Sequence, residues 1–128
     1  MTRNPVHTDD APRAIGPYSQ AIQVDGWVFT AGQIGADPKD GRLAATIEAQ
    51  TAQALANLQR ILAAAGCGWE HVVKTTVFLR SMADFTAFNS VYEGVLAAPY
   101  PARATVGAAG LPKNALIEIE AIAYRDGD

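Results

Sequence analysis

Two apolar stretches near the start of the chain are separated by Asp25 and Gly26, in the sequence SQAIQVDGWVFTAGQ. An Asp-Gly pair between apolar runs is typical of a two-residue hairpin turn, because that turn favours positive φ at both central residues. We therefore expect two antiparallel strands on either side of this pair. The next stretch, IGADPKDGRL, collects Gly, Asp and Pro and is typical of a surface loop.

Apolar residues recur at helical spacing from Thr46 to Ala65 and predict a helix there. Gly66 follows where a left-handed C-cap is favoured. A second helix is predicted from Ser81, which has the spacing of a capping box with Asp84, although the usual third partner is Glu or Gln. The segment AAPYP ends this helix. Its apolar face consists of Phe85, Phe88, Tyr92, Val95 and Leu96.

The sequence VVKTTVFL, residues 72–79, is β-branched and alternating, which predicts a strand between the two helices. One side of it is expected to carry Val73, Thr75, Val77 and Leu79, and the other Lys74 and Thr76. Two final strands are predicted near residues 102–109 and 116–123.

This order of elements indicates an α+β fold, in which two helices pack on one face of a mixed β-sheet. The length of 128 residues favours a single domain over residues 1–128. The second face of so small a sheet needs cover, and packing against copies of the same chain is a common solution.

Composition narrows the function classes. The formal net charge is −3 and the basic residues are scattered, which argues against a nucleic-acid partner. No run approaches the roughly 18 apolar residues of a membrane span, and the N-terminal segment lacks a secretory signal, so we expect a cytoplasmic protein. Cys67 is the only cysteine, and with His7 and His71 it offers no zinc-binding spacing, so no metal site is expected. A Cys67–His71 nucleophile and base pair is less favoured than a stray thiol in a loop.

Three charged residues stand in the two final strands. Strand alternation places Glu118 and Glu120 on one face of the last strand. If that strand pairs with the preceding one as a hairpin, Arg103 lies on the same face or the opposite one, depending on a register that the sequence leaves open. The trio is either a cross-strand or intersubunit ion pair, or a site where Arg103 grips a small carboxylate and a glutamate acts as acid or base.

The stretch PARATVGAAGLPKNALIEIEAIA, residues 101–123, resembles the signature of the Rid family, the reactive intermediate deaminases also called YjgF proteins. The resemblance also includes AIGPYSQAI (residues 14–22), TAGQIG (30–35), VVKTTVFL and FNSVYE (88–93), and it covers nearly the whole chain. Arginine followed by Ile-Glu-Ile-Glu is similar to the RidA-like branch.

The resemblance implies a chorismate-mutase-like fold and a homotrimer with active sites between subunits. It further implies hydrolysis of 2-imino acids, such as 2-iminobutanoate and 2-iminopropanoate, to 2-oxo acids and ammonia. These imines escape from pyridoxal-phosphate enzymes that act on serine and threonine, and they can damage other enzymes. No metal or organic cofactor is implied.

The resemblance assigns roles to residues of this chain. Arg103 would bind the substrate carboxylate and Glu118 would activate the attacking water, whereas Glu120 would make a structural contact. Asn89 stands on an otherwise apolar helix face, where an amide needs a partner, and it serves either the pocket or a structural hydrogen bond. The other expected pocket residues are Tyr18, Gly32 and Thr105.

Many family members have cysteine where this sequence has Thr105, which leaves the preferred imine open. Two alternatives to the deaminase remain. One is an endoribonuclease or translation inhibitor, an activity reported under the family's name. The other is a noncatalytic trimer that binds small carboxylates or acts like a chaperone.

Overall fold

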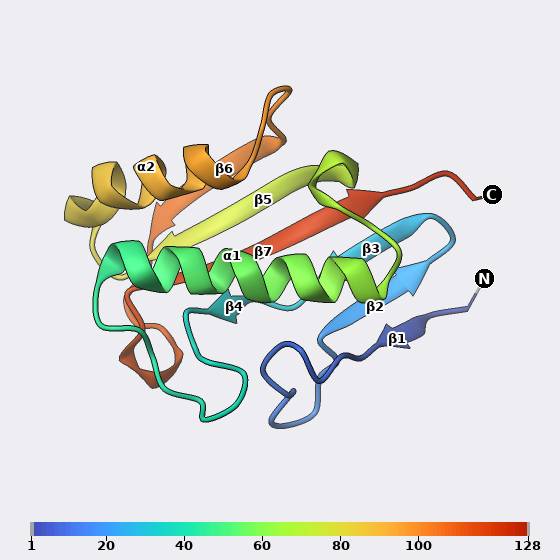
Figure 1. The fold of residues 1–128 in the computed structure, drawn as a ribbon, viewed down its shortest axis with the longest axis horizontal. Helices are drawn as coiled ribbons and strands as arrows, with labels where there is room; N and C mark the ends of the chain where they lie inside the picture. The colour runs from blue at the N-terminus through green and yellow to red at the C-terminus, as the bar shows by residue number, and fades with distance from the viewer. Residues whose placement is uncertain (1, 128) are drawn as a thin grey trace.

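The computed structural model describes residues 2–127, which form one mixed sheet covered by two helices (Figure 1). The strand order is β1-β2-β3-β7-β5-β6, and the short β4 pairs with β7. All neighbours are antiparallel except β5 and β6, which are parallel. The strands are β1 (Asn4–Val6), β2 (Ala21–Val24), β3 (Trp27–Thr30), β4 (Gln33–Ile34), β5 (Val72–Leu79), β6 (Ala102–Gly107) and β7 (Ile117–Tyr124).

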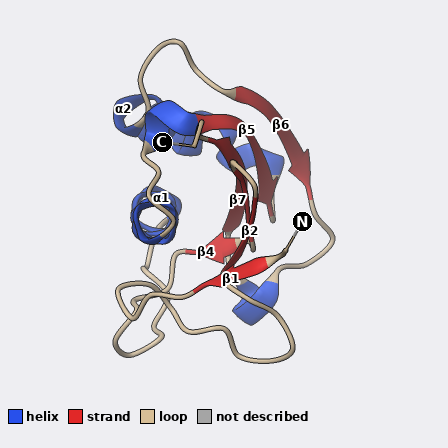
Figure 2. Ribbon diagram, turned by 90° about the vertical axis from the view of Figure 1, so that its right-hand side faces the viewer, coloured by secondary structure: helices blue, strands red, loops and turns tan. Residues whose placement is uncertain are grey.

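Both helices, α1 (Ile47–Ala64) and α2 (Phe85–Val95), lie on the same face of the sheet, as Figure 2 shows. This confirms the predicted α+β architecture with two helices on one face. The described residues also form short 3₁₀ turns: η1 (Trp69–His71), η2 (Met82–Asp84) and η3 (Pro112–Asn114). The core lies between the helices and the sheet, where one face of β7 contributes Ile117, Ile119, Ala121 and Ala123.

The predicted hairpin joins β2 to β3, with Val24 opposite Trp27. Positive φ occurs at Asp25 (52°) but not at Gly26, so the expectation for both central residues is half right. Gly26 is required instead for space, because a β-carbon there would lie 2.5 Å from the carbonyl oxygen of Arg125. The turn is therefore fastened to the end of β7.

The first helix begins and ends as predicted. Thr46 is its N-cap and accepts the N–H of Ala49 at 3.1 Å, while Gly66 takes the left-handed conformation with φ 80°. The second helix begins later than expected, because Ser81 caps the 3₁₀ turn η2 and accepts the N–H of Ala83 at 3.2 Å. The predicted capping box with Asp84 is not formed.

One residue of β5 contradicts the predicted alternation. A register shift between Val72 and Lys74 against β7 marks a bulge, so Val73 is 44% exposed and does not share the buried side of Thr75. Thr75, Val77 and Leu79 share one side of the strand as predicted, and all three are buried. In residues 2–127 neither helix combines the length and the hydropathy that a bilayer crossing requires.

Candidate active site

The structure answers how Arg103 and the two glutamates are arranged. The strands β6 and β7 do not form a hairpin, because β5 lies between them. Arg103 is in register with Thr75 of β5, which is fully buried under the helices, so Arg103 lies on the helix side of the sheet. Glu118 is in register with Phe78 and Glu120 with Thr76, and both glutamates lie on the opposite, open face.

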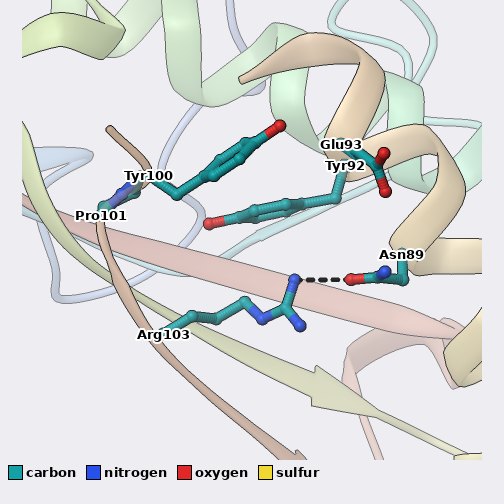
Figure 3. Close-up of a pocket in the computed structure, with 6 residues that line it drawn as sticks. All are labelled: Asn89, Tyr92, Glu93, Tyr100, Pro101 and Arg103. Atoms are coloured by element: carbon teal, nitrogen blue, oxygen red, sulfur yellow. Dashed lines mark hydrogen bonds between the residues drawn. The ribbon is translucent and has the colours of Figure 1, made fainter. Parts of the chain in front are cut away.

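Arg103 borders a cavity of about 420 Å³ between α2 and the segment that precedes β6. Its Nη1 donates a hydrogen bond to Oδ1 of Asn89 at 2.8 Å (Figure 3). Asn89 thus has the partner that its place on an apolar helix face required. The cavity is lined by Asn89, Tyr92, Glu93, Tyr100, Pro101 and Arg103.

Glu118 has a different environment. Its side chain is half-buried and rests against the backbone of Gly32, where a β-carbon would lie 2.6 Å from Oε2 of Glu118. Burial raises the pKa of Glu118, and the nearby charge of Glu120 raises it further. Among residues 2–127 no salt bridge involves Arg103, Glu118 or Glu120, so the charged trio is not an ion pair within one chain.

The predicted site residues therefore fall into separate groups. Arg103 and Asn89 meet at the cavity, and Glu118 and Gly32 meet on the open face. Thr105 lies on the same side of β6 as Arg103 but does not line the cavity. Tyr18 is 53% exposed in the loop before β2, where its hydroxyl accepts the N–H of Ile15 at 3.3 Å.

Some residues that line the cavity were not among the site residues predicted from the sequence. Glu93 follows Asn89 by one helical turn, so the i, i+4 spacing of α2 contained the signal that places it there. Tyr92 was assigned only to the apolar face of the helix. Tyr100 and Pro101 precede β6 in an irregular segment, which gives no periodicity from which their position could be inferred.

Within the described part of the chain, His, Cys, Asp and Glu side chains form no group of three or more that could hold a metal ion. What the arrangement offers is a cation beside a cavity on one face and a carboxylate with a raised pKa on the other.

Comparisons with known sequences and structures show which family the chain belongs to. The family model described as endoribonuclease L-PSP matches residues 8–125. The 2-iminobutanoate/2-iminopropanoate deaminase of Mus musculus is 48% identical over 126 residues, which cover 98% of this chain and 93% of that protein.

Two solved structures are similar over nearly their whole length. RidA from the Antarctic bacterium Psychrobacter sp. PAMC 21119 is 43% identical, with a TM-score of 0.94 and coverage of 96% of this chain and 100% of that one. E. coli TdcF with bound serine is 38% identical, with a TM-score of 0.92 and coverage of 96% and 99%. This chain therefore belongs to the endoribonuclease L-PSP family, the Rid or YjgF family whose motifs its sequence carries.

Proposed function

We propose that this protein is a deaminase that hydrolyses 2-imino acids, among them 2-iminobutanoate and 2-iminopropanoate, to 2-oxo acids and ammonia. The observation that carries the proposal is the environment of Arg103: its guanidinium borders a cavity and donates to a neutral amide instead of a carboxylate. Its positive charge is thus available to an incoming anion. A relative of 48% identity named for this reaction supports the same substrate class.

Arg103 acts by binding and orienting the substrate. A guanidinium presents five N–H donors, of which Asn89 accepts one, and two parallel donors match the two oxygens of a carboxylate. Holding the carboxylate fixes the imine carbon for attack, which lowers the entropic part of the barrier. The serine bound to E. coli TdcF is likewise a small molecule with a carboxylate.

Glu118 acts as base and then as acid. It accepts a proton from the water that adds to the imine carbon, and it returns a proton as the C–N bond breaks and ammonia leaves. The C=N bond is exchanged for C=O without any change of oxidation state, so the reaction requires no redox cofactor. A carboxyl whose pKa is raised is suited to both steps, because it accepts and releases a proton nearer to neutral pH.

The two groups need two chains to meet. Because Arg103 and Glu118 face opposite sides of one sheet, we assign the reaction to a cleft between subunits of a homotrimer. The open face supports such an assembly, since large apolar side chains stand exposed on it. These are Trp27 (41%), Phe29 (45%), Val106 (43%) and Tyr124 (39%).

An ammonia-release assay tests the function. Threonine dehydratase would generate 2-iminobutanoate, and hydrolysis in buffer alone would be subtracted. We expect the wild-type protein to accelerate ammonia release. Arg103→Lys keeps the charge but loses the paired donors, so turnover should fall by at least about tenfold, the factor that corresponds to one charge-assisted hydrogen bond of about 1.5 kcal/mol.

Each alternative has its own outcome. A folded Arg103→Lys variant with near-normal turnover would reduce Arg103 to a structural residue. Binding of serine without any ammonia release would favour the noncatalytic carboxylate binder. Cleavage of a labelled RNA by the wild-type protein would favour the endoribonuclease, which the net charge of −3 and the scattered basic residues argue against.

A further inference from the structure

The guanidinium of Arg103 is surrounded by aromatic rings on one side. Its ζ-carbon lies 4.9 Å from the ring centroid of Tyr92, 5.2 Å from that of Phe88 and 5.7 Å from that of Phe85. All three are distances at which a cation is attracted to the face of a ring. The rings come from one face of α2 at spacings of three and four residues.

These rings also hold one another. Phe85 and Phe88 meet edge to face with centroids 5.6 Å apart, and Phe88 and Tyr92 do so at 5.8 Å. Phe88 is fully buried and Tyr92 is 3% exposed. The guanidinium therefore rests on a packed platform and not on mobile surface side chains.

One hydrogen bond fixes the ring nearest to Arg103. The hydroxyl groups of Tyr92 and Thr75 lie 2.8 Å apart and share a hydrogen bond, and Thr75 is fully buried. Thr75 is also the β5 residue in register with Arg103. Burial raises the pKa of Tyr92, so its hydroxyl stays protonated and does not form an ion pair with the arginine. Figure 3 shows the Tyr92 ring and the Asn89 amide beside the guanidinium.

We propose that Tyr92, anchored by Thr75, is a positioning residue that sets the orientation in which Arg103 receives the substrate carboxylate. The inference rests on the proposed function and concerns the residues that hold Arg103 in place at the carboxylate site. Asn89 holds one edge of the guanidinium, the rings hold its face, and the remaining donors are directed to the ligand. The competing explanation is that Thr75 and Tyr92 only fasten α2 to the sheet.

Two variants remove the bond from opposite ends. Tyr92→Phe keeps the ring and its contact with Arg103, and Thr75→Val keeps the volume at the buried position. We expect each to raise the KM for 2-iminobutanoate by about three- to tenfold, with kcat changed less than about twofold, as one neutral hydrogen bond would. The double variant should be no worse than either single one, because both remove the same bond.

Control variants separate positioning from stability. Thr75→Ser retains the hydroxyl and should restore the wild-type KM. Ile61→Val, in the buried face of α1, lowers the melting temperature without touching Arg103 or the cavity and should leave the KM unchanged. Unchanged KM in Tyr92→Phe and Thr75→Val, together with a lower melting temperature like that of Ile61→Val, would overturn the positioning role.

A binding measurement keeps this test independent of turnover. The affinity for 2-oxobutanoate, the expected product, would be measured by calorimetry on the intact assembly. Its Kd should rise in Tyr92→Phe and Thr75→Val by the same factor as the KM. If the wild-type protein binds 2-oxobutanoate but shows no turnover, the deaminase proposal is refuted, and the Kd values of the variants still decide the positioning role. If the Kd is equal in the wild type and both variants, the positioning role alone is refuted.

Discussion

At the residue scale, Glu118 is set apart from Glu120 by its surroundings and not by its place in the strand pattern. Both side chains lie on the open face of β7 and both are half-buried. Burial raises the pKa of Glu118, which packs against Gly32, and the charge of Glu120 raises it further by a smaller amount. Glu120 therefore contributes to the raised pKa of Glu118. The structural contact that the resemblance implied for Glu120 did not include this electrostatic effect.

This arrangement predicts a pH dependence. Glu118 must be ionised to accept a proton, so kcat/KM should fall as the pH drops through its raised pKa, above the ordinary value of about 4.3. In Glu120→Gln the midpoint of this acid limb should move to lower pH, because one of the two causes is removed. The measurement is a pH profile of ammonia release corrected for buffer hydrolysis.

The controls use the same carboxylates. Glu118→Gln should lose turnover on the order of 10² and show no acid limb. Because its pKa is raised in the folded state, ionised Glu118 opposes folding, and stability is lost as the pH rises through that pKa. The melting temperature of Glu118→Gln at neutral pH should therefore equal or exceed that of the wild type. An unshifted acid limb in Glu120→Gln would contradict the coupling.

At the element scale, the sequence patterns predicted most of the fold and failed where pairing is decided at long range. Both helices, the hairpin at Asp25 and the alternation of β7 were predictable from local spacing. The bulge at Val73 was not, because it arises from the register of β5 against β7. The hairpin considered for the two final strands is wrong: β5, α2 and β6 form a parallel unit with a helical crossover, which the order strand–helix–strand allowed.

Long-range pairing also decides the part of the candidate site that the sequence patterns did not predict. Alternation predicted the shared face of Glu118 and Glu120, but the face of Arg103 depends on its pairing with Thr75, which no local pattern specifies. The aromatic platform was visible in the sequence as the apolar face of a helix. Arg103 reaches these aromatic rings only because β6 pairs beside β5.

Two glycines provide a matched test of these elements. Gly26→Ala should lower the free energy of unfolding by roughly 1–3 kcal/mol, because the added β-carbon would meet the backbone of Arg125. Gly94→Ala, in α2, meets no atom within 4 Å and should raise it by roughly 0.5–1 kcal/mol through helix propensity. Chemical denaturation measures both. A neutral Gly26→Ala would show that the turn can move away from β7.

At the scale of the whole molecule, the residues of the proposed site are divided between the two faces of the sheet. The helix side carries the cavity with Arg103 and its platform, and the open side carries Glu118 with Gly32. A single subunit therefore contains both halves of the proposed site, but on opposite faces of its sheet. This separation is the physical basis for the intersubunit site of the proposed trimer.

Mixing two impaired variants tests the division. Arg103→Lys and Glu118→Gln subunits, unfolded and refolded together in equal amounts, should recover about a quarter of wild-type turnover. Each site in the proposed ring contains Arg103 of one subunit and Glu118 of its neighbour. In a random equal mixture each of these residues is intact in about half of the subunits, so both are intact in about a quarter of the sites. The two variants refolded separately and then assayed in one cuvette are the control. No recovery in properly assembled mixed trimers would mean that both residues of a site come from the same chain.

The position of β7 also governs the order in which the protein can form during its synthesis. Residues 117–124 follow every other strand along the described chain, yet they occupy the middle of the sheet between β3 and β5. Until they leave the ribosome, the β1–β2–β3 part and the β5–β6 part have no strand to join them. The nascent chain therefore exposes two unpaired sheet edges, the kind of surface that chaperones protect, and closes its core only when its last strand is inserted.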